Sequence, residues 1–132
     1  MPRVSLAFFT AAPIYGLIGM VWGIVMGATN DHGMMPAHAH LNLLGMVLNA
    51  IFGTFYALAG ARVSSRLAWA NFYISNAAVL IMVPTLAQIL TVGDANAGKL
   101  IPIIVVSEIL AVVGLLTFLA SVVGLWRKPA QA

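Results

Sequence analysis

The sequence has no cysteine and very few charged residues. Of its 132 residues, 7% are charged and 62% are hydrophobic, whereas a soluble domain carries roughly 25% charged residues. The lack of cysteine excludes disulfides, thiolate metal ligands, iron–sulfur clusters and thiol nucleophiles. The shortage of charge excludes a water-facing surface over most of the chain, so the predicted environment is a lipid membrane.

Polar residues do not alternate with apolar ones along the chain. We expect helices at about residues 6–26, 39–59, 67–90 and 101–125, separated by short polar stretches. Each run is near the ~20 residues that cross a bilayer as a helix, and barrel strands would alternate. The predicted fold is all-α, an integral membrane four-helix bundle forming one domain over residues 1–132. Such a bundle buries a core by helix packing within one chain or between copies, and we expect a homo-oligomer. A cleaved signal peptide is the lesser reading of the first run, whose apolar core is longer than usual.

Positive charge is concentrated at the N-terminus, the second connection and the C-terminus, in Arg3, Arg62, Arg66, Arg127 and Lys128. If four helices alternate in direction, these residues share one side of the membrane, and Asp31, Asp94 and Lys99 lie on the other. The positive-inside rule then predicts cytoplasmic termini and an outer, periplasmic first connection in a bacterial inner membrane. The net charge of +3 is explained by this anchoring, with no further basic patch for nucleic acid.

All three histidines, His32, His38 and His40, lie in one segment, DHGMMPAHAHLNLLG, at residues 31–45. Neutral imidazole binds iron, copper and zinc, and the thioethers of Met34 and Met35 favour copper(I) or a heme axial position. Polar residues near a membrane are costly. The segment therefore predicts a bound heme or metal ion, and histidines that only form hydrogen bonds at the membrane surface are the alternative.

The two histidines of the second helix point in different directions. At about 100° per residue, His38 lies on a small, polar stripe that we expect to face the bundle. The other members of this stripe are Asn42, Gly45, Asn49, Gly53 and Tyr56. His40 points roughly 160° away, above Leu44, Val47, Ile51 and Leu58, toward lipid or another subunit. The two imidazoles therefore need not serve one site.

Glycines offer places for close approach. Gly19, Gly23 and Gly27 follow one another at four-residue spacing in the first helix, a pattern typical of close helix packing. A flat cofactor against the bare face is the functional alternative, and Gly45 and Gly53 on the His38 stripe offer a second such face.

Glu108 is an acidic residue about two turns inside the last helix. An ionisable residue within a membrane helix costs roughly 2.5–3.5 kcal/mol on insertion scales, and such residues usually face the interior. We expect Glu108 to face the bundle as a direct ligand, as an acceptor that orients a ligating histidine, or as a proton acceptor. A protonated carboxyl hydrogen-bonded to Ser107, Gln88 or a backbone carbonyl is the alternative.

The segment PAHAHLNLLGMVLNAIFGTFYALAG, residues 36–60, resembles the second helix of subunit I of the heme–copper (cytochrome c) oxidases and their small four-helix relatives. The shared pattern is H-x-H-L-x-x-L-G followed by G-x-x-Y, read here from His38 to Tyr56, and YGLIGMVWGIVMG resembles the preceding helix. The resemblance covers roughly residues 10–60 and implies that a histidine near the outer end of this helix ligates a low-spin heme. The other histidines of a complete oxygen reductase have no counterpart in this chain.

The sequence therefore predicts a small membrane protein that binds heme b and transfers electrons or binds NO or O2. His38 is the first choice as axial ligand and His40 the second, with Asn42 and Glu108 orienting an imidazole and Gly45 allowing close approach. A five-coordinate heme, a histidine–methionine pair, ligation by His32 and a ligand from a second subunit all remain open. The alternatives are a copper or zinc site using His32, His38 and His40, with Glu108, Asp31 or the methionines as further ligands, and a cofactor-free accessory bundle. No nucleophile–base pair predicts catalysis.

Overall fold

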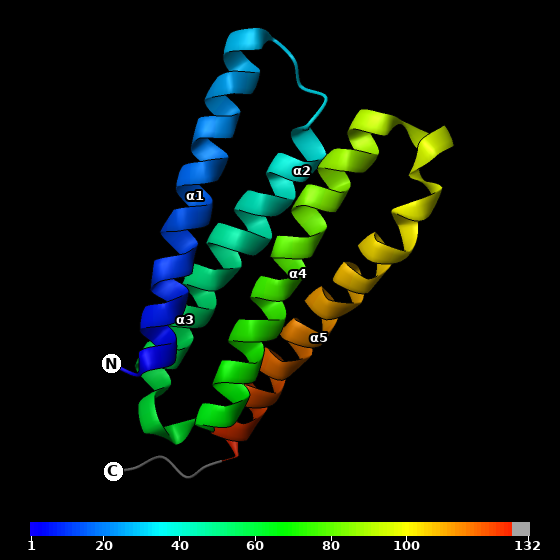
Figure 1. Cartoon of the computed structure of the whole chain (residues 1–132). Coiled ribbons are helices and arrows are strands. Elements are labelled where there is room, and N and C mark those ends of the chain that lie inside the picture. The colour runs from blue at the N-terminus through cyan, green and yellow to red at the C-terminus, as the bar shows by residue number, and fades with distance from the viewer. Residues whose placement is uncertain (128–132) are drawn as a thin grey trace.

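The computed structural model describes residues 1–127, and the side chains of these except residues 94–96. Lys128 and the side chain of Asp94, both used in the charge argument, lie outside that description. Four long helical segments, called rods below, make up the fold (Figure 1). The elements are α1 (Arg3–Thr29), α2 (Met35–His40), a π-helical segment η1 (Leu41–Val47), α3 (Leu48–Ala59), the 3₁₀ turn η2 (Gly60–Arg62), α4 (Ser65–Val92), the 3₁₀ segment η3 (Asp94–Lys99) and α5 (Ile101–Trp126).

The prediction of four membrane-length helices is confirmed. In the described part of the chain, Arg3–Thr29, Met35–Arg62, Ser65–Val92 and Ile101–Trp126 are all long and apolar enough to cross a membrane. Each extends beyond the predicted run at one or both ends. α1, for example, ends where Asn30 adopts a left-handed conformation with φ 53°, which asparagine tolerates better than most residues.

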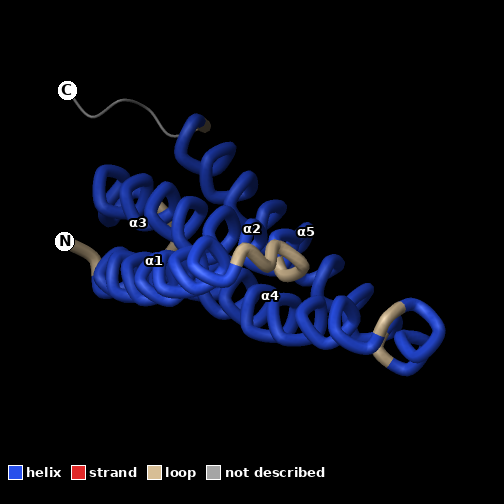
Figure 2. The backbone as a smooth tube through the Cα atoms, turned by 90° about the horizontal axis from the view of Figure 1, so that it is seen from above, coloured by secondary structure: helices blue, strands red, loops and turns tan. Residues whose placement is uncertain are grey.

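Successive rods run in opposite directions, with α2, η1 and α3 forming one continuous rod (Figure 1). The N-terminus, η2 and the end of α5 lie at one end of the bundle, and the α1–α2 and α4–α5 connections lie at the other. The view from above also shows α4 and α5 side by side (Figure 2).

An aromatic core occupies the end of the bundle near the termini. Phe8 of α1 is fully buried and stacks on Tyr56 of α3 with ring centroids 5.7 Å apart. Phe118 of α5 reaches Phe52 with a centroid distance of 4.5 Å. Aromatic contacts therefore connect α1, α3 and α5 at this end, and Phe72 of α4 joins them through Phe8.

Small and polar residues join α4 to α5. Asn71 of α4 is fully buried, and its Nδ2 donates to the Gly114 carbonyl oxygen of α5 at 2.6 Å. Gly114 lies against Ser75, where a Cβ would collide with the serine hydroxyl. Close approach at glycine and a side-chain hydrogen bond across the contact are typical of helix association in membranes.

Candidate functional site

The H-x-H pair is followed directly by a change in helix type. α2 ends at His40, and η1 continues as a π-helix through Leu41–Val47. A π-helix takes an extra residue per turn, and such segments are frequent at functional sites. A uniform 3.6-residue period does not predict this segment. The stripe still faces the bundle, since Gly45, Asn49, Gly53 and Tyr56 are buried and His38 and Asn42 half-buried.

A buried amide supports the widened turn. Asn49 is fully buried, and its Nδ2 donates to the Gly45 carbonyl oxygen at 2.7 Å and the Leu44 carbonyl oxygen at 3.2 Å. These bonds satisfy carbonyl groups that a change of helix type disturbs, and buried polar groups are costly when unpaired. Asn49 is thus the sequence signal that accompanies η1, although asparagine alone would not have predicted a π-helix.

The same amide belongs to a chain of hydrogen bonds across three rods. The Tyr15 hydroxyl of α1 donates to Asn76 Oδ1 of α4 at 3.0 Å. Asn76 Nδ2 in turn donates to Asn49 Oδ1 at 3.0 Å. All three residues are buried. This series of hydrogen bonds connects α1 and α4 to the π-helical segment and fixes its position.

His38 is half-buried and faces α1, as the stripe predicts. Its ring stands edge-on to Trp22, with centroids 6.3 Å apart. A Cβ added at Gly23 would lie 3.1 Å from His38 Cε1, so the glycine makes room for the imidazole. Asn42 Nδ2 lies 3.1 Å from His38 Nε2 and 3.5 Å from His38 Nδ1, and it donates to the His38 backbone carbonyl oxygen at 3.1 Å. The imidazole therefore packs among Trp22, Gly23 and Asn42.

The glycine faces are filled by side chains of the bundle. Asn42 lies against Gly19, and a Cβ at Gly45 would lie 2.8 Å from Tyr15 Cγ. A Cβ at Gly53 would lie 3.0 Å from Phe8 Cβ. Gly27 has nothing within 4 Å of that position. Apart from Gly27, these glycines therefore accept neighbouring side chains, so within residues 1–127 the space between His38 and α1 is taken by side chains of the bundle.

His40 lies on the opposite face of the helix and is exposed, as the 100° turn per residue predicts. Its Nδ1–H donates to the Pro36 carbonyl oxygen at 2.7 Å. Because a carbonyl only accepts hydrogen bonds, this contact places the proton on Nδ1 and leaves the Nε2 lone pair free in the neutral ring. A bond from one ring nitrogen to a backbone carbonyl is the usual support of a histidine whose other nitrogen binds a metal.

The remaining candidates are not brought together. His32 is exposed in the α1–α2 connection. Among the described residues, no three histidine, aspartate or glutamate side chains group where they could hold one metal ion. Glu108 is exposed, contrary to the expectation that it faces the interior, because this turn of α5 presents Ser107 to the bundle instead. Within residues 1–127, its carboxyl has no hydrogen bond or ion pair with a histidine.

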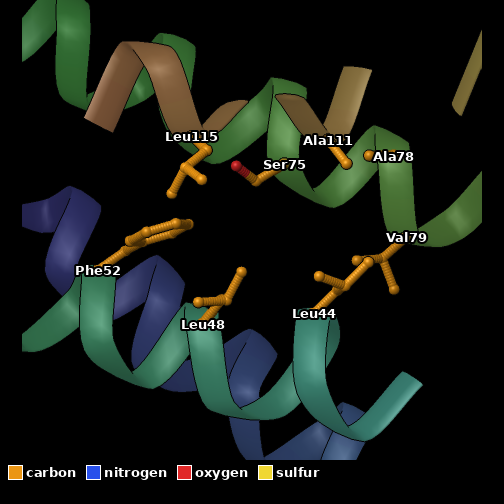
Figure 3. A pocket seen from close by; sticks show the side chains of 8 residues that line it. All are labelled: Leu44, Leu48, Phe52, Ser75, Ala78, Val79, Ala111 and Leu115. Atoms are coloured by element: carbon orange, nitrogen blue, oxygen red, sulfur yellow. The ribbon is translucent and has the colours of Figure 1, made fainter. Parts of the chain in front are cut away.

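The cavity between η1, α3, α4 and α5 does not suit a cofactor. Its lining side chains are Leu44, Leu48, Phe52, Ser75, Ala78, Val79, Ala111 and Leu115 (Figure 3). The volume of about 20 Å³ is near the minimum that holds one water molecule. Ser75 is its one polar lining side chain, so the cavity offers no strong ligand for a metal.

The chain was compared with models of protein families, with curated proteins and with solved structures, and none of them matches it.

Proposed function

We propose that this protein binds heme b in the membrane, with an axial ligand from the H-x-H pair, and transfers electrons or binds NO or O2. The observation that carries the proposal is the state of His40, whose Nδ1 is bonded to the Pro36 carbonyl while Nε2 keeps its lone pair. The resemblance of residues 36–60 to the heme-ligating helix of oxidase subunit I supports the same chemistry.

We favour His40 over His38 as the axial ligand, reversing the order expected from the sequence. The His38 ring is half-buried against Trp22 and Asn42, and it already occupies the space at Gly23. His40 lies on an exposed face at the start of a membrane span, five residues from the first residue of α2. At about 1.5 Å per residue, this is roughly 8 Å from the helix end, so heme propionates beside it can reach water.

The test is the visible spectrum of protein purified in detergent from heme-replete cells, with a pyridine hemochrome assay. We expect a Soret band and bound heme b that are lost in His40→Ala and kept in the matched variants His38→Ala and His32→Ala. Colourless wild-type protein would contradict the proposal. Elemental analysis for copper and zinc would then test the metal reading, and absence of both would leave the cofactor-free bundle.

A further inference from the structure

His40 is exposed, and His38, the other histidine of this rod, points away from it. His38 and His40 project from opposite sides of one helix, with His38 against Gly23 and Trp22 and His40 exposed. A porphyrin has two axial positions on opposite faces, so two ligands must approach from opposite directions. Two residues of one helix that point apart cannot do this. A second imidazole on the far face of a heme at His40 can come from another copy of the chain.

The geometry points to a second copy of this chain as the source of that ligand. We infer that two copies pair around one heme, each presenting His40 Nε2 to one axial position. The inference rests on the proposed function and deepens it. A two-fold dimer whose axis passes beside His40 brings the two His40 side chains to opposite sides of that axis, so one exposed histidine per chain supplies both ligands. The hydrogen bond to Pro36 fixes the same tautomer in both copies.

The surface beside His40 suits a porphyrin face. Leu43 and Val47 follow His40 along the rod at three- and four-residue intervals and are 58% and 37% exposed. Ile51 continues the same line at 49% exposure. This exposed line of His40, Leu43, Val47 and Ile51, called the outer stripe below, is apolar apart from the histidine. It can cover the porphyrin ring while His40, nearest the helix end, holds the iron.

The number of axial ligands determines whether the iron can bind NO or O2. With an imidazole on both sides, the iron has no open position for NO or O2. The paired protein is therefore an electron carrier, and its heme content and its dimerisation are linked, because heme that binds the dimer stabilises it by mass action.

The experiment measures heme per chain, oligomeric mass in detergent and the response of the reduced protein to CO. We expect one heme for two chains, a dimer with a low-spin bis-imidazole EPR signal, and little spectral change with CO. His40→Ala should reduce bound heme about tenfold or more and convert the dimer to monomer, while added imidazole restores part of the low-spin spectrum. His38→Ala is the matched control and should keep heme and dimer. Circular dichroism checks that both variants are folded.

The opposing outcomes separate this inference from the proposed function. One heme per chain with full CO binding would overturn the shared site and leave a five-coordinate heme protein. Heme that survives in His40→Ala but is lost in His38→Ala would overturn it too, while heme binding itself stands. Wild-type protein without heme would remove both proposals.

Discussion

The two faces of the second rod differ as much as any two regions of this molecule. The inner face, from His38 through Asn42 and Asn49, has its polar groups paired within the bundle. The outer stripe has one polar group, His40, with one nitrogen paired and the other free. Burial and pairing within the bundle, rather than residue type, therefore distinguish the two faces. The same side chain packs the bundle at one position and offers a ligand two residues later.

The largest loss of stability is expected where the inner face is most tightly packed. In Gly45→Val, the new Cβ would lie 2.8 Å from Tyr15 Cγ, so the α1 contact must open. Overpacking of this kind costs about 1–3 kcal/mol or more, and the thermal midpoint in detergent should fall clearly. Gly124→Val is the control because Gly124 is exposed with nothing within 4 Å of its Cβ position. Equal midpoints for the two variants would contradict the packing described for Gly45.

A smaller loss is expected for Asn49→Leu. This change removes the donor for the Gly45 and Leu44 carbonyl groups and the acceptor for Asn76. Buried groups left unpaired cost about 1–3 kcal/mol, partly offset here by the retained volume. Thr54→Val is the control on the same rod, since its hydroxyl is exposed and bonds the Ala50 carbonyl of its own turn. Amide hydrogen exchange through η1 should rise in Asn49→Leu and stay constant in Thr54→Val.

Tyr15, which begins the series of hydrogen bonds through Asn76 to Asn49, allows a single hydrogen bond to be tested. Tyr15→Phe removes only the hydroxyl that donates to Asn76 Oδ1. Hydrogen bonds between membrane helices contribute about 0.6 kcal/mol on average and up to about 1.7, so a modest fall in the free energy of unfolding is expected. Tyr73→Phe is the matched control because Tyr73 is 63% exposed. An effect at Tyr73 equal to that at Tyr15 would show that ring polarity, not this bond, is responsible.

Much of this inner–outer contrast follows from the sequence. Length and hydropathy predict the four rods, and a 3.6-residue period separates the faces of His38 and His40. The π-helical segment does not follow, because its support comes from Asn49 together with tertiary contacts. The link from Tyr15 to Asn76 spans 61 residues, and no local pattern encodes it. The glycines of α1 predict close approach but not that Asn42 and His38 side chains fill the space.

Glu108 was misplaced for a different reason. The general tendency of intramembrane carboxylates to face the interior was applied to a helix that is largely exposed along its length. In the apolar 18-residue stretch of α5, 11% of the residues are buried. Most positions on this helix therefore face away from the bundle. The orientation of α5 depends on where Ser107 and Gly114 meet α4, and that register becomes visible only in three dimensions.

The smallest effect is therefore expected for Glu108→Gln. The carboxyl is exposed and, in the described part of the chain, has no partner to lose. A surface substitution of this kind usually changes stability by less than about 0.5 kcal/mol, so the thermal midpoint and heme content should match wild type. The neighbouring Ser107→Leu is the control from the buried face, where a large side chain must displace α4 and the midpoint should fall. If Glu108→Gln instead lowered heme content as His40→Ala does, the carboxylate would be part of the heme site. The ligand would then have to be sought on the face of α5 rather than on the outer stripe.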